Sequence, residues 1–300
     1  MHFYRKSMTR NESDTAWKEI LDAYFKDCIE YCLPELSALI NWQKSFVSLD
    51  KELQAITKGT TSGKRLLDKL FKVHLKDGRE QWVLIHIEVQ GKPDDEFAKR
   101  MFTYGYRIYD KYQQPIVSCA ILTDDHKEWR PHHYEVGLAG SYLSSEFLVI
   151  KLIDYRNKRK ELEASMNPFA SVILVQLAAL EAKSKPDEQR KQVKFALTRR
   201  LYEKGFSKKE VCNLYKFIDW LIGLSKPLEL EYLNEVYELE ESKKMAYISN
   251  AEKFGIEKGI KKVAEQSLEQ GLKPAVIKKI TGLSLAQIKL LQQKLKRAKH

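Results

Sequence analysis

The sequence predicts an α/β fold in which a mixed sheet flanked by helices is followed by an all-helical region. Two strand-like runs, at 65–75 and 81–90, precede a helical pattern, and a near-continuous apolar run at 116–122 follows it. After Asp154 every periodic segment has helical spacing. The order helix, strand, strand, helix, strand, strand is typical of α/β or α+β proteins with a mixed sheet.

The first elements are helical. Apolar side chains recur three and four residues apart over residues 14–31, which predicts an amphipathic helix that Pro34 ends. A short helix is expected to open near Asp50 and to end before the turn residues at 59–63.

The predicted sheet comes next. Asp77-Gly78 lies between the first two strand-like runs and predicts a hairpin. A helix is expected from Pro93 to about Tyr112, because apolar residues recur there at helical spacing. The apolar run at 116–122 is expected to be a central strand buried on both faces, and 147–153 a further strand.

The remainder is predicted to be helical, with a boundary near 155–165. Helices are expected to start at Asn167, Pro186 and Ser207, and the last start has a capping-box pattern. A long charged helix is expected from Tyr232 to about Glu269. Segments 274–280 and 285–295, joined by a short turn that contains glycine, are typical of a helix-turn-helix. We therefore expect a domain over 1–160, a helical region over 161–250 and a basic region over 251–300.

Charge is concentrated at the C-terminus. The chain has 52 Lys and Arg against 41 Asp and Glu, a net charge of +11 that favours polyanionic partners such as DNA. Residues 271–300 contain eight basic residues and no acidic one, which leaves only +3 for the rest of the chain. The eight are Lys273, Lys278, Lys279, Lys289, Lys294, Lys296, Arg297 and Lys299.

Composition and the N-terminus exclude several classes. A hydrophobic content of 43% is that of a globular rather than a disordered chain. The four cysteines do not make a disulfide framework or a zinc knuckle and are expected to be reduced. The first residues lack the apolar region of a signal peptide, and no apolar stretch is long enough to span a bilayer. A cytoplasmic protein with no membrane partner is the expectation.

Candidate chemistry lies in the two hairpin strands. Strand alternation places Glu88 and Gln90 on one face of the second strand, about 6.5 to 7 Å apart. The first strand supplies Asp68 within an apolar run. A carboxylate in an apolar strand is costly unless it is paired or binds a cation. Two carboxylates beside an amide suit a hard divalent cation, which could support phosphodiester hydrolysis.

The pattern of Asp68, a hairpin, then Glu88-x-Gln90 and a helix resembles the core of the PD-(D/E)XK nucleases, with Gln where that superfamily most often has Lys. The stretches 46–54, 67–73, 82–90 and 97–104 more closely resemble the Rpn family of recombination-promoting nucleases, also described as transposase-like. The resemblance covers about residues 40–155. It implies a PD-(D/E)XK-like core and a DNA endonuclease that depends on Mg²⁺ or Mn²⁺ and is associated with recombination in bacteria.

The resemblance also implies roles for residues. Asp68 and Glu88 would bind the metal, with Gln90 as the third catalytic residue and Glu52 as a further metal ligand. Two departures are the missing Pro before Asp68 and the Gln, which cannot supply the charge of a Lys. Arg100 and Tyr104, one turn apart on the next helix, could support the site or contact phosphate.

Each assignment has an alternative. Asp68 and Glu88 could be ion-pair partners of Lys69, Lys72 or Arg100, and Glu52 would stabilise a helix start through its charge alone. His86 shares the face of Glu88 and could be a ligand or base, although a buried, hydrogen-bonded histidine is the simpler interpretation.

The C-terminal lysines allow two interpretations as well. They could contact DNA phosphates, or they could lie outside a self-associating helix pair, which makes a homo-oligomer a further expectation. The leading hypothesis is the metal-dependent endonuclease. The first alternative is a catalytically silent DNA-binding or regulatory protein on the same scaffold, and a weaker one is a helical assembly protein.

Overall fold

The structure is a computed structural model of the 300-residue chain. Its contacts divide the chain into two units, Met1–Leu233 and Asn234–His300, which are described separately. The residues that it describes are 10–57, 67–76, 82–248, 263–268, 270, 272–281, 283–284 and 287–292.

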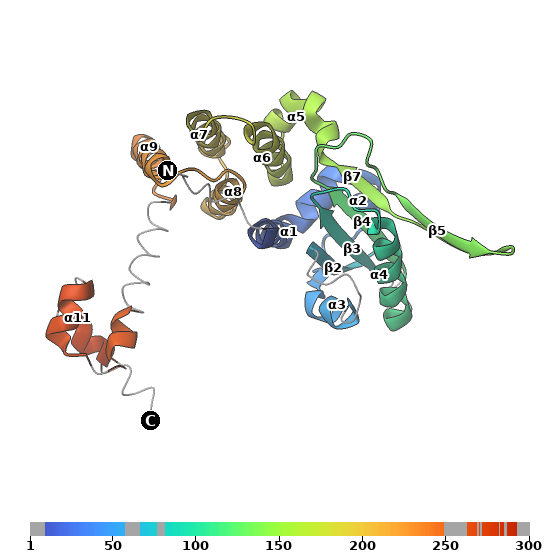
Figure 1. Cartoon of the computed structure of the whole chain (residues 1–300), viewed down its shortest axis with the longest axis horizontal. Helices are drawn as coiled ribbons and strands as arrows, with labels where there is room; N and C mark the ends of the chain where they lie inside the picture. The colour runs from blue at the N-terminus through green and yellow to red at the C-terminus, as the bar shows by residue number, and fades with distance from the viewer. Residues whose placement is uncertain are drawn as a thin grey trace. The chain divides into compact units, whose positions relative to one another are not determined.

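The first unit is built on a five-stranded mixed sheet (Figure 1). In sheet order the strands are β1 (Val47–Ser48), β2 (Leu67–His74), β3 (Trp82–Gln90), β4 (Ile116–Leu122) and β7 (Leu148–Lys151). The pairs β1–β2 and β2–β3 are antiparallel, whereas β3–β4 and β4–β7 are parallel. The mixed sheet predicted from the sequence is confirmed. The predicted Asp77-Gly78 turn lies outside the described residues.

Helices cover both faces of the sheet. Helix α4 (Phe97–Tyr112) connects β3 to β4, and α3 (Asp50–Thr57) packs beside it. Helix α1 (Arg10–Cys32), which Pro34 ends as predicted, contacts β2. Every residue from Leu84 to Gln90 is buried as a result, so polar side chains in β3 must find partners inside the protein.

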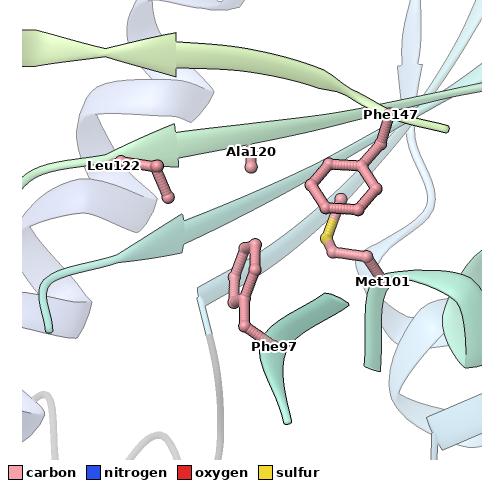
Figure 2. Close-up of a cluster of buried hydrophobic side chains, with 5 residues drawn as sticks. All are labelled: Phe97, Met101, Ala120, Leu122 and Phe147. Carbon is pink, nitrogen blue, oxygen red and sulfur yellow. The ribbon is translucent and has the colours of Figure 1, made fainter. Parts of the chain in front are cut away.

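An apolar cluster fixes the N-terminal end of α4 on the sheet. Figure 2 shows Phe97 and Met101 on α4 packed with Phe147 and with Ala120 and Leu122 of β4. Phe97 is fully buried, and its ring meets the rings of Trp129 and Phe147 edge to face. This packing sets the position of the residues that follow Phe97 on α4.

After β7 the first unit is helical, as predicted. It comprises the 3₁₀ helix η1 (Leu152–Lys158), α5 (Arg159–Ala164), α6 (Pro168–Ala182), α7 (Asp187–Glu203) and α8 (Lys208–Leu221).

Two of the predicted helix starts are capped. The Asn167 side chain accepts a hydrogen bond from the amide of Phe169 at 2.8 Å, and Ser207 and Glu210 form a capping box. Helix α1 packs against both α6 and α8. The sheet and these helices therefore share one unit, and the boundaries expected near residues 160 and 250 differ from this division.

Four elements were not predicted. They are the short helix α2 (Pro34–Leu39), strand β1 and a separate two-stranded ribbon of β5 (His133–Leu138) and β6 (Ser141–Glu146). The ribbon contains Gly137 and several serines, which are typical of loops. The sequence therefore gives only a weak indication that these residues form strands.

The prediction of one long helix from Tyr232 to about Glu269 is wrong, because the helix ends much earlier. Helix α9 (Lys226–Lys243) ends where Lys244 adopts a left-handed conformation, with φ of 53°. The Glu240 carboxylate accepts hydrogen bonds from the amides of Tyr247 and Ile248, at 2.8 and 2.6 Å. A side chain thus holds the turn that stops the helix.

The second unit contains a small helical core. A helical segment at 263–268, helix α11 (Pro274–Thr281) and a helical segment at 287–292 are described. Buried side chains join the three: Ala264, Ile277, Ile288 and Leu291. The amide of Ser284 donates to Gln287 Oε1 at 2.9 Å, which marks the start of the last segment. Among the described residues, no helix combines the length and the apolar character needed to cross a bilayer.

Candidate functional site

Three polar side chains meet where β3 ends. Glu88 and Gln90 share one face of β3, and Arg100 reaches them from the first turns of α4. Glu88 is fully buried, and Gln90 and Arg100 are 5% and 7% exposed. The sequence predicted Glu88 and Gln90 as site residues and Arg100 as a possible support, and the structure brings these three side chains together.

Arg100 is the centre of the group. Its Nε donates to Glu88 Oε1 at 2.8 Å, Nη1 donates to Asp94 Oδ2 at 2.7 Å, and Nη2 lies 3.5 Å from Gln90 Oε1. Its guanidinium also lies 5.2 Å from the Phe97 ring centroid. Burial alone would lower the pKa of Arg100, but the charge of Glu88 and hydrogen bonds to Asp94 and Glu88 hold that pKa above its ordinary value. Arg100 therefore stays charged and balances Glu88.

The other site carboxylates lie in different places. Asp68 pairs directly with Glu88 in the β2–β3 register, but its side chain lies outside the described residues. Glu52 is exposed on α3. Burial, and to a smaller extent the charge of Glu52, raises the pKa of Tyr112. Tyr112 ends α4, about three turns from Arg100. The structure places Glu52 toward that end of α4 rather than beside Arg100.

Lys69, considered as a partner of Asp68 or Glu88, is paired elsewhere. It is buried, and its ammonium donates to Asp22 of α1 and Asp50 of α3. Of the ion-pair partners considered for Glu88, the structure contains Arg100. The carboxylate is therefore compensated by charge in this structure.

Sequence reasoning missed two contributors at this edge of the sheet. Asp94, the residue after Pro93 at the start of the predicted helix, holds Arg100 in place. Asp124, just after β4, pairs with Lys151 at the end of β7 at 2.7 Å, and both are about 3% exposed. These residues could have been found from their positions, because all of them follow or end neighbouring parallel strands at the carboxyl edge of the sheet. The Lys151 ammonium also donates to the carbonyl of Trp129, so the pair is structural.

His86 lies two residues before Glu88 on the same face of β3, and it packs against Tyr104 of α4. Their rings meet edge to face at 5.9 Å, and both side chains are buried. Neither ring nitrogen of His86 has a hydrogen-bond partner within the described part of the chain. Burial lowers the pKa of His86 from 6.5 to about 4. The hydrogen-bonded histidine expected from the sequence is not what the structure contains.

This shift makes stability depend on pH. The unfolded chain, with the ordinary pKa, binds a proton on His86 before the folded chain does, so His86 destabilises the fold progressively as pH falls below about 6.5. Between about pH 7 and about pH 4.5, we expect the wild type to lose on the order of 2 to 3 kcal/mol more than His86→Leu. Urea unfolding of both proteins at the two pH values measures the difference. Parallel losses in both proteins would contradict it.

The donor atoms at the end of β3 are of the kind that hard cations prefer. Glu88 offers a carboxylate and Gln90 an amide oxygen, with Asp68 opposite in the register. Among side chains that the structure describes, no group of three or more His, Cys, Asp or Glu converges. These donor atoms fit Mg²⁺ or Mn²⁺. Glu88 is the carboxylate of this set whose side chain is described, and in this structure it forms an ion pair with Arg100.

The basic C-terminal residues are described in part. Lys273, Lys278 and Lys289 are exposed, outside the core of the second unit. The side chain of Lys279 and residues Lys294, Lys296, Arg297 and Lys299 lie outside the described part.

Comparison with protein families addresses the segment that carries this site. Residues 32–118 match the family described as "Putative transposase, YhgA-like". The match confirms, over this segment, the family resemblance drawn from the sequence. It contains Glu52, Asp68, Glu88, Gln90 and Arg100, and it ends before the β5–β6 ribbon. Comparisons with curated proteins and with solved structures give no match.

Proposed function

We propose that the chain is a metal-dependent DNA endonuclease of the PD-(D/E)XK type that acts in a transposition- or recombination-related process. The observation that carries the proposal is the pairing of Asp68 with Glu88 in adjacent strands, with Gln90 two residues further along the same face. A hairpin followed by a crossover helix and a parallel strand, β2–β3–α4–β4, is the arrangement that the PD-(D/E)XK resemblance implies. The transposase-like family match supports the link to DNA.

The side chains have separate tasks in this proposal. Asp68 and Glu88 would hold Mg²⁺ or Mn²⁺, which when bound supplies a Lewis acid for phosphodiester hydrolysis. Gln90 would orient a ligand through its neutral amide, which adds no charge. Its Nε2 donates to the carbonyl of Lys92 at 2.8 Å, and this hydrogen bond fixes the orientation of the amide. Arg100 positions Glu88. Asp94 can retain Arg100 when Glu88 turns to a cation, because it binds a different guanidinium nitrogen.

Nicking of supercoiled plasmid tests the activity directly. We expect purified full-length protein to convert supercoiled plasmid to nicked or linear DNA with Mg²⁺ or Mn²⁺ and to stop when EDTA is added. Cutting that persists in EDTA would exclude the metal-dependent mechanism.

The Arg100–Glu88 ion pair also favours a second candidate, a catalytically silent DNA-binding or regulatory protein. A buried carboxylate whose charge is balanced by an ion pair can serve as a structural part of the fold without binding a metal. Binding of plasmid without cutting, under any of these metal conditions, would support this candidate over the enzyme.

The basic C-terminal region supplies a prediction about DNA binding. Replacing the exposed Lys273, Lys278 and Lys289 by Gln is expected to weaken binding to any duplex. The slope of log affinity against log salt should fall in magnitude by about 0.9 for each phosphate that the variant no longer neutralises. Binding measured at several salt concentrations gives the slope.

The matched control replaces the same three residues by Arg, which keeps the charge and should keep the slope. If this region mediates self-association instead, the opposite result is expected. Removing the region would then change the oligomeric mass in light scattering and leave the salt slope unchanged. An unchanged slope in the Gln variant would remove these lysines from the DNA interface.

A further inference from the structure

The guanidinium of Arg100 is surrounded by oxygen atoms of the kind that bind a hard cation. Glu88 Oε1, Asp94 Oδ2 and Gln90 Oε1 lie 2.8, 2.7 and 3.5 Å from three different nitrogens of this guanidinium. Two of these oxygens belong to residues that the proposed nuclease uses at its metal site. Arg100 therefore binds the donor atoms that a divalent cation would need.

Burial turns this shared use into competition. The Glu88 side chain is fully buried and that of Arg100 almost so, and solvent screens charges weakly in such surroundings. A divalent cation on either oxygen of the Glu88 carboxylate would lie beside the guanidinium, and the two positive charges would repel each other. Cation binding therefore requires that Arg100 moves away from Glu88.

Asp94 offers Arg100 a second anion at the start of α4. It binds a different guanidinium nitrogen from the one that Glu88 binds, and its side chain is 33% exposed. Its own position is fixed, because Oδ1 accepts from the amide of Glu96 and its carbonyl accepts from the amide of Phe97, each at 3.1 Å. The guanidinium can thus turn about the Asp94 contact and keep a countercharge.

We propose that Arg100 is a resident counter-cation that keeps the cation site closed, and that a divalent cation binds by exchange, with the guanidinium leaving Glu88 and staying on Asp94. Asp94 is then a positioning residue for Arg100. The exchange lowers the affinity of the site for metal, because only the fraction of molecules with a released Glu88 can bind. Since the exchange regulates the same site, it rests on the proposed metal-dependent function.

A purely supporting role of Arg100 predicts the opposite change in metal affinity. If Arg100 only orients Glu88 as a ligand, its loss weakens metal binding about 10- to 100-fold, as is usual for groups that support metal ligands. If Arg100 competes with the metal, its loss strengthens binding. The direction of the change in metal affinity therefore separates the two roles.

Binding of Mn²⁺ to the full-length protein without DNA tests the exchange, with free Mn²⁺ measured by electron paramagnetic resonance. Binding that Glu88→Gln loses is assigned to this site. We expect Arg100→Gln, which removes the competing charge, to bind Mn²⁺ at least about 10-fold more tightly than the wild type. The matched control is Lys99→Gln, which removes an exposed charge from the same turn of α4 and should change the affinity less than about 2-fold.

Asp94→Asn tests the second half of the exchange and keeps the ion pair of Glu88 with Arg100. We expect it to weaken Mn²⁺ binding about 10-fold, because Arg100 then has Glu88 alone as its anionic partner in this group. In the Arg100→Gln background most of this effect should disappear, since Asp94 acts through Arg100. An effect that persists in full would mean that Asp94 contacts the cation itself, which contradicts the exchange.

Circular dichroism confirms that each variant is folded. Equal or weaker Mn²⁺ binding by folded Arg100→Gln overturns the exchange, and it leaves the nuclease proposal standing if the wild type binds Mn²⁺ through Glu88. Should Arg100→Gln fail to fold, Asp94→Asn decides alone, and wild-type affinity in that variant overturns the exchange. If neither the wild type nor Arg100→Gln binds Mn²⁺ through Glu88, both the exchange and the metal-dependent mechanism are wrong.

Discussion

Replacing Glu88 by glutamine is expected to lower the rate of Mg²⁺-dependent plasmid nicking at least about 100-fold, because loss of a supporting group alone costs about 10- to 100-fold at metal sites. Glutamine keeps the shape of the side chain and an oxygen that can accept from Arg100 Nε. Asp94 continues to hold the other end of the guanidinium. The variant should therefore fold, and initial rates of nicking at saturating Mg²⁺ measure the loss.

Two further variants test whether Glu88 acts in a shared site. Asp68→Asn should be impaired to a similar degree, and the double variant little more than either single one, since each change alone disrupts the same cation site. Gln90→Ala should be impaired less than Glu88→Gln, because the amide contributes no charge. A Gln90→Ala defect equal to that of Glu88→Gln would show that the amide has a larger role.

Glu135→Gln is the matched control, since this glutamate lies in the ribbon and is exposed. It should cut at the wild-type rate. Undiminished nicking by folded Glu88→Gln would remove the end of β3 from consideration as the active site.

The largest effect on stability is expected at Phe97. Its ring is fully buried among Met101, Leu122 and Phe147 (Figure 2). Truncation to alanine removes that burial and leaves a cavity, which costs about 3 to 5 kcal/mol of unfolding free energy. Chemical unfolding followed by tryptophan fluorescence measures the loss.

Tyr109→Ala is the control on the same helix. Its side chain is 52% exposed, so the change in unfolding free energy should stay within about 0.5 kcal/mol. Phe97→Leu, a milder change, also removes the ring over which the Arg100 guanidinium lies. It should slow nicking while the protein stays folded. Equal stability of Phe97→Ala and Tyr109→Ala would contradict the assignment of this cluster as the core.

The sequence determined the elements whose pattern is local. The apolar run at 116–122 became β4 with the same bounds, and the Ser207 capping box forms as predicted. Alternation in β3 placed Glu88 and Gln90 on one face, because strand periodicity requires no partner to be known. One turn of helix between Arg100 and Tyr104 likewise put both on the side that faces the sheet.

The tertiary structure alone decided which charges meet. Arg100 could have paired with phosphate, Glu88 or nothing, and it is the packing of Phe97 on β4 that brings it to Glu88 and Asp94. Lys69, adjacent to Asp68 in sequence, pairs instead with Asp22 of α1 and Asp50 of α3, which lie 47 and 19 residues earlier in the chain. Side-chain pairing depends on distances between elements, and one sequence fixes only positions within an element.

The same reason explains the ribbon and the extent of the first unit. Residues 133–146 have no strong local signal for strands, and their two faces became visible only once the register was known. The contact of α1 with α6 and α8 joins segments more than a hundred residues apart, and no local pattern in the sequence indicates such a contact. Periodicity within a segment is written in the sequence, whereas the pairing of distant segments is settled by which apolar faces bury each other.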